Sequence, residues 1–265
     1  MIDLHSHILP GIDDGAPDLA AAVDLASAAV ADGTEVIAAT PHLREDHPGV
    51  HLGELADRTA ALNQVLADCQ VPLRVVAGAE VDVHWARAAS EEELRLATYG
   101  QAGTDLLLET PYGPLPPGFE DWVSSRLAGQ GYRVMLAHPE RNVSFQHDPG
   151  RLAEMVDRGV LVQVTASSLA RGRRSESGVL ARWLVDVGAA HIVASDAHAA
   201  RDFRPPLLSV GATAIASRVD EARAKWMAHD APKAVLLGEP LPPMPEAPPP
   251  GPLLRLFRRQ QRSAR

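Results

Sequence analysis

Seven short apolar runs, most of them followed by a helical pattern, constrain the fold of this 265-residue chain more than any other feature. The runs are rich in β-branched residues and lie at residues 1–5, 35–42, 73–83, 105–111, 133–139, 160–166 and 191–198. Helical patterns are expected at residues 17–32, 53–68, 120–130, 150–158 and 177–187, and a glycine follows several of them. This alternation predicts a parallel sheet covered by helices, and seven strands favour a barrel over an open sheet.

Length and composition predict one folded domain and a tail. With 46% apolar residues the chain can bury one large core, and single α/β barrels commonly have roughly 200–250 residues. Residues 240–252 contain eight prolines, which is typical of an extended linker. We therefore expect a domain over residues 1–239, followed over residues 240–265 by a proline-rich linker and a basic, disordered tail.

The charge of the chain is unevenly distributed. The last thirteen residues contain five arginines and no acidic residue, so the formal charge of −9 divides into +5 there and −14 over residues 1–252. The acidic body argues against binding of nucleic acid. Leucine and phenylalanine side chains among the tail arginines allow a weak contact with an anionic membrane surface, although a solvated end is the simpler interpretation.

The sequence favours a cytoplasmic location. It contains no signal-peptide core and no apolar run near the roughly 20 residues that cross a bilayer. The single cysteine, Cys69, excludes an internal disulfide and fits a reducing compartment; we expect it to be buried or half-buried at a helix end. We expect a cytoplasmic protein whose tail at most brings it to the inner face of the membrane.

Side chains with metal-binding chemistry lie at the carboxyl ends of six of the seven predicted strands. His5 and His7 close the first run, and because strand side chains alternate with period two, both project to the same side. Other runs end in groups such as Thr-Pro-His at 40–42 and Ser-Asp-Ala-His at 195–198. The carboxyl ends of parallel barrel strands meet at one face, where active sites are built. These groups are therefore expected to converge in one pocket.

The converging set contains five histidines and four carboxylates, without a thiolate. Such a set suits Zn, Mn or Fe and exceeds the needs of one ion, so two or three metal ions are expected. Two carboxylates have alternatives: Asp14 competes with Asp13 and with a helix-capping role, and Glu109 could pair with an arginine at the rim. Six histidines match no strand end and are expected to be surface or structural residues: His47, His51, His84, His147, His191 and His229.

These motifs resemble the polymerase-and-histidinol-phosphatase (PHP) superfamily, and within it most closely the bacterial manganese-dependent tyrosine-protein phosphatases of capsule and exopolysaccharide operons. The motifs are His-Ser-His-Ile-Leu-Pro-Gly-Ile-Asp-Asp-Gly at 5–15, Thr-Pro-His at 40–42, Gly-Ala-Glu at 78–80, His-Pro-Glu-Arg at 138–141, Ser-Asp-Ala-His at 195–198 and Arg-Pro-Pro at 204–206. The resemblance covers about residues 1–240 and implies a distorted (β/α)7 barrel of the PHP type. The metal ligands that it implies are His5, His7, Asp14, His42, Glu80, Glu109, His138, Asp196 and His198.

The resemblance also implies an activity. A metal-bound hydroxide would hydrolyse phosphotyrosine on the tail of a bacterial tyrosine autokinase. The site would hold two or three divalent ions, with Mn as the expected metal and Zn, Fe or Mg as alternatives. Arg141 and Arg204 match the family's phosphate-contacting arginines, and His198 could supply a proton. From the residues alone, Arg141 could instead form a salt bridge at the barrel mouth, and Arg204 could be an exposed loop residue.

Two other functions stay open at this point. A small-molecule phosphatase such as histidinol phosphatase would use the same chemistry on a different substrate. A non-catalytic regulator that binds a membrane kinase through its tail would not need the metal ligands at all.

Overall fold

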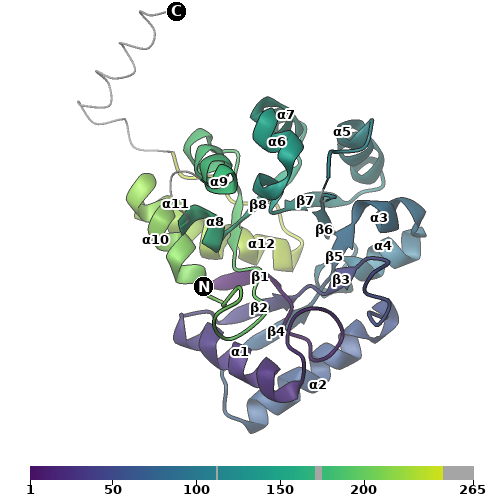
Figure 1. Ribbon diagram of the computed structural model, residues 1–265, viewed down its shortest axis with the longest axis vertical. Coiled ribbons are helices and arrows are strands. Elements are labelled where there is room, and N and C mark those ends of the chain that lie inside the picture. The colour runs from purple at the N-terminus through teal and green to yellow at the C-terminus, as the bar shows by residue number, and fades with distance from the viewer. Residues whose placement is uncertain (112, 171–174, 247–265) are drawn as a thin grey trace, which may run out of the picture.

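The computed structural model describes residues 1–111, 113–170 and 175–246 and shows a parallel α/β fold, with strands at the centre and helices around them (Figure 1). One sheet has the order β1 (Ile2–Ser6), β2 (Val36–Ala39), β4 (Arg74–Ala77). The other has the order β3 (His42–Leu43), β5 (Glu80–Asp82), β6 (Asp105–Glu109), β7 (Arg133–Ala137), β8 (Leu161–Thr165), β9 (Ile192–Ala194). Every pair of neighbouring strands is parallel.

Two of the seven predicted strands are each divided in two. The run at 35–42 forms β2 and β3, and the run at 73–83 forms β4 and β5. The first break falls at Pro41, which has no N–H to donate to a ladder, and the second at Gly78, whose Cα faces the ring of Tyr99. Each break moves the end of its strand from the first sheet into the second.

The two parallel sheets with helices around them confirm the predicted α/β fold. β9 leads back to β1 through an isolated parallel bridge between Ser6 and Ala197. The His7 N–H donates to the Ala197 carbonyl at 2.8 Å, and the Asp196 N–H donates to the His5 carbonyl at 2.9 Å. With β2/β3 and β4/β5 each counted as one position, the nine strands occupy seven positions, as the seven runs predict.

Helices cover the outside of the two sheets (Figure 1). The longer ones follow apolar stripes, and several of the shorter ones carry too few residues for a stripe to show in the sequence. Their bounds are α1 Leu19–Ala31, α2 Leu55–Asp68, α3 Val83–Ala88, α4 Glu91–Ala97, α5 Phe119–Asp121, α6 Val143–His147, α7 Pro149–Asp157, α8 Ala166–Ala170, α9 Glu176–Val187, α10 Leu208–Arg218, α11 Glu221–Lys225 and α12 Ala231–Leu237. Short 3₁₀ segments lie at Leu52–Glu54, Tyr99–Gln101 and Pro139–Arg141, and π-helical turns at Trp122–Leu127 and Trp226–Asp230.

The predicted helices appear within a few residues of their expected bounds. The stretch at 120–130 is helical as predicted, but most of it is a π-helix, which the sequence pattern did not indicate. α1 is capped by Asp18, whose side chain accepts from the Ala21 N–H at 2.9 Å, so Asp14 has no capping role. α9 ends at Gly188, which has φ 76° in the left-handed region that favours glycine.

Cys69 lies at the end of α2, as expected, but it is exposed, so the prediction of a buried or half-buried thiol is wrong. The buried face of α2 is taken by Leu62 and Leu66, and the capping position points elsewhere. No helix in the described ranges combines the length and apolar character needed to cross a membrane.

The start of the predicted linker lies against the domain. Arg133 donates to the Glu239 carbonyl at 2.7 Å, the Trp226 indole to the Pro242 carbonyl at 3.0 Å, and Arg223 to the Pro245 carbonyl at 2.6 Å. The basic tail lies outside the described residues. The division at residues 239 and 240 therefore stays a prediction.

His191, which precedes β9, links folding to pH. Its Nδ1 accepts from the Val162 N–H at 3.1 Å, and burial, together with the positive charge of Arg223, lowers its pKa from 6.5 to about 4. Between these two values the unfolded chain binds a proton that the folded chain does not. Neutral His191 therefore contributes to the free energy of unfolding. This contribution is fully present above pH 6.5 and is lost as the pH falls towards 4. The shift corresponds to about 3 kcal/mol of the free energy of unfolding.

The substitution His191→Asn tests this linkage, because the Asn Oδ1 can accept from Val162 and does not titrate. We expect the free energy of unfolding of the variant, measured by urea denaturation with a chelator present, to fall less between pH 7 and about pH 4.5 than that of the wild type. The expected difference is roughly 2–3 kcal/mol. If the free energy of unfolding fell equally in the two proteins, the lowered pKa assigned to His191 would be wrong.

Candidate metal centre

The first two predicted ligands lie at the carboxyl end of β1, where an irregularity in the pairing with β2 falls between Asp3 and Ser6. The His5 Nδ1 faces the Gln163 Oε1 of β8 at 3.0 Å, and the His7 Nδ1 faces the Asp13 Oδ2 at 2.7 Å. With Nδ1 held by a hydrogen bond, each ring can offer Nε2 as a ligand atom. Both Nε2 atoms lie 3.5 Å from Asp196 Oδ1.

Glu80, the first residue of β5, lies at the centre of the site. Its Oε2 is 3.0 Å from His42 Nδ1, 3.2 Å from His5 Nε2 and 3.5 Å from His7 Nε2. Its Oε1 is 2.8 Å from His138 Nε2. One fully buried carboxylate therefore contacts four histidines that come from the ends of three other strands and their loops.

The loop after β1 supplies the most exposed member of the site. Asp14 Oδ1 lies 3.3 Å from His198 Nε2 and 3.5 Å from His42 Nε2, and the Asp14 side chain is 48% exposed. Asp13 points instead at the far side of the His7 ring and also accepts from the His42 N–H at 3.3 Å. The structure therefore separates the two aspartates, with Asp14 among the predicted ligands and Asp13 orienting His7.

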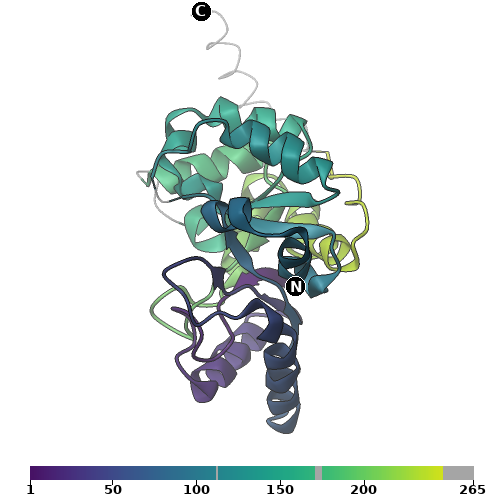
Figure 2. The ribbon, with the colours of Figure 1, turned by 90° about the vertical axis from the view of Figure 1, so that its right-hand side faces the viewer.

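All nine predicted ligands are brought together. Their ligand atoms form four groups, and within each group these atoms lie no more than 4.8 Å apart. The loops after β1 and β9, which carry four of these residues, lie with the loop after β3 on one side of the molecule (Figure 2). Neighbouring groups share histidines or Glu80, so the site can hold more than one ion. The groups are His7, Asp14, His42 and His198; His5, Glu80 and His138; His5, His7 and Asp196; and His42, Glu80 and Glu109.

The site contains buried polar atoms that make no hydrogen bond to any described residue. They are His5 Nε2, His7 Nε2, His42 Nδ1, both Glu80 carboxylate oxygens and Asp196 Oδ1. A buried polar atom without a partner costs free energy, and native structures rarely gather several of them in one place. Divalent cations would satisfy all of them, because imidazole nitrogens and carboxylate oxygens are the donors that Mn, Zn and Fe accept. The residues present therefore fit a polynuclear metal centre.

The charges of the site fit the same chemistry. Although burial opposes it, the positive charge of His5 and His138 holds the pKa of Glu80 well below its ordinary value. Burial and the nearby charge of Glu80 raise the pKa of Glu109 to about 9. Glu109 therefore needs added positive charge to ionise at neutral pH. Arg44 supplies part of it, because its Nη1 donates to Glu109 Oε2 at 3.1 Å.

Asp196 connects the histidines to the two predicted phosphate-binding arginines. Its Oδ1 faces His5 and His7, whereas its Oδ2 accepts from Arg141 Nη1 at 2.6 Å and lies 3.3 Å from Arg204 Nη1. The salt bridge considered for Arg141 is thus present, and it holds the guanidinium beside the site. Arg204 is not an isolated loop residue, since its Nη1 also lies 3.1 Å from His198 Nε2.

A buried network holds Arg141 from its other side. Arg141 Nη2 donates to the Thr165 hydroxyl at 3.2 Å, and this hydroxyl donates to Glu140 Oε1 at 2.6 Å. The Thr165 N–H donates to the same Glu140 oxygen at 3.0 Å. The carboxylate thereby turns the hydroxyl lone pairs towards the arginine.

Sequence reasoning missed three residues that line the site. Arg44 contacts Glu109, and the His47 ring stacks on the His42 ring with centroids 4.9 Å apart, so His47 is not merely a surface residue. Both follow Thr-Pro-His at 40–42 by a few positions, which is the signal that could have indicated them. Gln163 lies inside a strand, where its type and spacing gave no signal.

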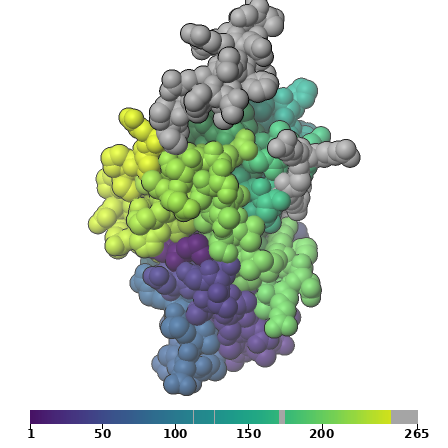
Figure 3. Space-filling view, turned by 90° about the vertical axis from the view of Figure 1, so that its left-hand side faces the viewer, coloured from purple at the N-terminus to yellow at the C-terminus, as the bar shows by residue number. Residues whose placement is uncertain are grey.

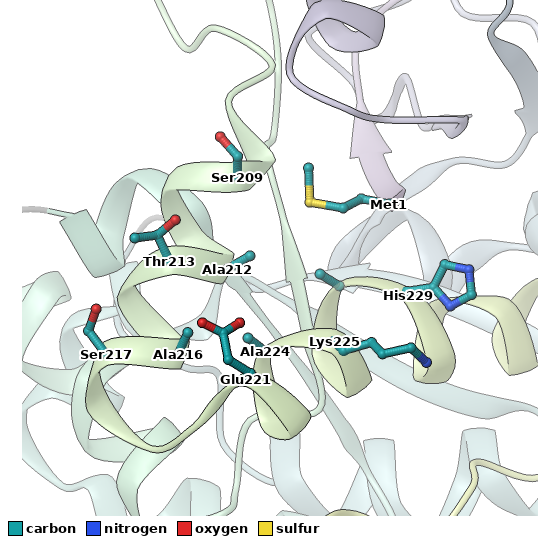
Figure 4. Close-up of a pocket in the computed structure, with 11 residues that line it drawn as sticks. Met1, Ser209, Ala212, Thr213, Ala216, Ser217, Glu221, Ala224, Lys225 and His229 are labelled. Carbon is teal, nitrogen blue, oxygen red and sulfur yellow. The ribbon is translucent and has the colours of Figure 1, made fainter.

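Two hollows differ in their relation to the site. One of about 490 Å³ adjoins it and is lined by Arg44, Glu45, Asp82, His84, Glu109, Thr110 and Pro111. Another of about 540 Å³ lies between α10 and α11, where Met1 and several alanine, serine and threonine side chains line it (Figure 4). It is at the amino end of β1, and Figure 3 shows the N-terminal residues in purple between the surfaces of α10 and α1. The ligand groups found among the described residues all lie at the opposite end of the strand.

Residues 1–237 match the protein family described as capsular polysaccharide synthesis, CpsB/CapC. The tyrosine-protein phosphatase YwqE of Bacillus subtilis (strain 168) is 35% identical over 201 residues, which are 75% of this chain and 77% of that protein. The tyrosine-protein phosphatase CpsB of Streptococcus pneumoniae is 23% identical over 247 residues, which are 90% of this chain and 99% of that protein.

A solved structure is similar over almost the whole chain. It comes from the crystal structures of YwqE from Bacillus subtilis and CpsB from Streptococcus pneumoniae, described as metal-dependent tyrosine phosphatases. It matches with a TM-score of 0.79 and 29% identity, over 94% of this chain and 100% of the solved chain. These matches confirm the resemblance drawn from the motifs, and the chain belongs to the CpsB/CapC family of capsular polysaccharide synthesis proteins.

Proposed function

We propose that this chain is a metal-dependent phosphomonoester hydrolase that acts on phosphotyrosine in proteins. The observation that supports this most directly is the sharing of Asp196, with one carboxylate oxygen facing the ligand histidines and the other holding two arginines. A phosphate monoester needs positive charge on several oxygens at once, and this arrangement places guanidinium groups beside a metal centre. The relatives and the solved structure that match the chain carry the name of the same activity.

The proposed ligands are the nine residues of the four groups, and we infer two or three divalent ions, with Mn as the first choice. When bound, such ions bind phosphate oxygens and lower the pKa of a water molecule towards neutrality. Asp13 and Gln163 orient the rings of His7 and His5. Asp14 is the most exposed of the proposed ligands, so we infer that the substrate approaches from its side.

The arginines have a separate role in this proposal. Arg141, whose side chain is one quarter exposed, is held by Asp196 and Thr165, so it presents its guanidinium in a fixed orientation. Arg204 is one third exposed and can follow the substrate. Both would neutralise charge on the phosphate oxygens as the ester bond breaks. A tyrosinate is a relatively good leaving group. For a poorer leaving group we infer that His198, whose Nε2 lies 3.1 Å from Arg204 Nη1, would supply a proton in place of its role as a metal ligand.

The proposed substrate is a phosphotyrosine-bearing protein, and the family to which the chain belongs points to one that serves capsule or exopolysaccharide synthesis. We infer that this protein is a bacterial tyrosine autokinase with phosphotyrosines on its tail. A cytoplasmic location, with the basic tail near the inner face of the membrane, would bring enzyme and substrate together.

Phosphate release from a phosphotyrosyl peptide and from histidinol phosphate, measured side by side in Mn²⁺ and after chelation, tests the proposal. We expect release that needs the metal, prefers the peptide and disappears in His7→Ala. A preference for histidinol phosphate would assign the same site to small-molecule metabolism. An inactive protein that still binds the kinase would support the regulator instead.

A further inference from the structure

Phe203 is an apolar side chain in an unusual place. It lies in the loop between β9 and α10, and it is 59% exposed. Among the large apolar side chains that are exposed in the described part of the chain, it is the most exposed and the only aromatic one. Leaving more than half of a phenylalanine in water forgoes free energy that burial would provide, so its position calls for an explanation.

The ring of Phe203 contacts two residues of the candidate centre. Its centroid lies 5.7 Å from that of His198, and the two rings meet edge to face at 85°. The guanidinium carbon of Arg204 lies 5.2 Å from the centroid of the same ring. An aromatic surface therefore borders a predicted metal ligand and a predicted phosphate-binding arginine.

The loop holds Phe203 in this position with a strained backbone. Asp202 has φ 66° and Arg204 has φ 47°. The two residues that flank Phe203 thus have a left-handed backbone conformation, although neither is a glycine. Such conformations are costly for residues with a Cβ and persist where the surroundings hold them. The His198 N–H donates to the Arg204 carbonyl at 2.9 Å, and the Phe203 N–H donates to the Arg201 carbonyl at 2.8 Å. The loop is thus tied to the strand end that carries His198.

We propose that Phe203 binds the aromatic ring of the substrate and thereby selects aryl phosphates over alkyl phosphates. This inference rests on the proposed function, because it places the phosphate at Arg141 and Arg204. In an aryl phosphate only the ester oxygen separates phosphorus from the ring, so a phosphate at Arg204 brings that ring within reach of Phe203. Phosphoserine and histidinol phosphate have no ring at that distance. Stacked or edge-to-face aromatic contacts then favour the aryl ester.

Non-hydrolysable ligands test this selection without the influence of the leaving group. Phenylphosphonate and methylphosphonate present the same anion with and without a ring, and their affinity for the Mn²⁺-loaded protein can be measured by calorimetry. We expect wild-type protein to prefer phenylphosphonate by roughly tenfold, and we expect Phe203→Ala to bring the ratio close to one. Phe203→Tyr should keep the preference. Val187→Ala, which shortens an exposed apolar side chain at the end of α9, is the matched control.

The outcomes separate this inference from the proposed function. Equal ratios in wild type and Phe203→Ala would overturn the role of Phe203, whatever the catalytic activity. An equal loss of affinity for both phosphonates in Phe203→Ala would show that the residue only positions Arg204, and it too would overturn the aryl-binding role. Failure of wild-type protein to release phosphate from the phosphotyrosyl peptide would refute the proposed function by itself, since the calorimetric ratio does not depend on turnover.

Discussion

Replacing Glu80 with alanine should remove at least one bound metal ion and most of the phosphatase activity together. The Glu80 carboxylate lies within 3.5 Å of nitrogen atoms in His5, His7, His42 and His138, so it takes part in more than one predicted ion site. Its loss would leave four buried imidazoles without the negative charge that faces them. Metal ions contribute several kcal/mol of transition-state stabilisation, so we expect kcat/KM to fall by about a thousandfold or more.

The measurement pairs metal content with activity. Elemental analysis of the purified variant should show at least one ion fewer per chain than the wild type, and phosphate release from the peptide should fall in parallel. Glu80→Gln, which keeps the shape of the side chain and removes its charge, should show the same loss. Glu92→Ala, on the exposed face of α4, should change neither quantity. A Glu80→Ala protein with full metal content and full activity would refute the central position that the structure gives this residue.

The predicted ligands could be found from the sequence because two simple rules place them. Strand periodicity puts His5 and His7 on one side, and parallel topology brings the carboxyl ends of distant strands together. Neither rule depends on the exact length of a strand. The set therefore converges in the structure although Pro41 and Gly78 divide two of the predicted strands.

Loop geometry explains what the sequence left open. Asp13 and Asp14 are adjacent carboxylates, and only the fold shows that α1 is capped by Asp18 and that the two side chains face different rings. Arg44 and His47 come from a loop whose path follows no period, so their contacts with Glu109 and His42 could not be deduced from spacing.

The irregular backbone of the site could not be predicted from the sequence either. Asp196 and Arg204 have positive φ values of 55° and 47°, although neither is a glycine. Such values arise from tertiary contacts that hold the backbone, and no propensity predicts them. These residues lie where the β9 loop meets the site, so the least predictable backbone carries one predicted ligand and one predicted phosphate-binding residue.

Arg141→Ala should reduce kcat/KM for the phosphotyrosyl peptide by roughly a hundredfold to a thousandfold, because it removes a positioned donor from developing charge. Its guanidinium is fixed by Asp196 at 2.6 Å and Thr165 at 3.2 Å, so the orientation exists before substrate binds. Arg141→Lys keeps the charge but cannot make both contacts at once, and it should recover only part of the activity.

Thr165→Val and Thr165→Ser separate the orientation of Arg141 from its charge. The valine variant keeps the volume and removes the hydroxyl that joins Arg141 to Glu140, whereas the serine variant keeps the hydroxyl. If orientation matters, Thr165→Val should raise KM for the peptide or lower kcat by roughly tenfold, with metal content unchanged, and Thr165→Ser should restore most of the loss. Full activity in Arg141→Ala would show instead that the salt bridge with Asp196 is only structural, and the phosphate-binding role would then rest on Arg204 alone.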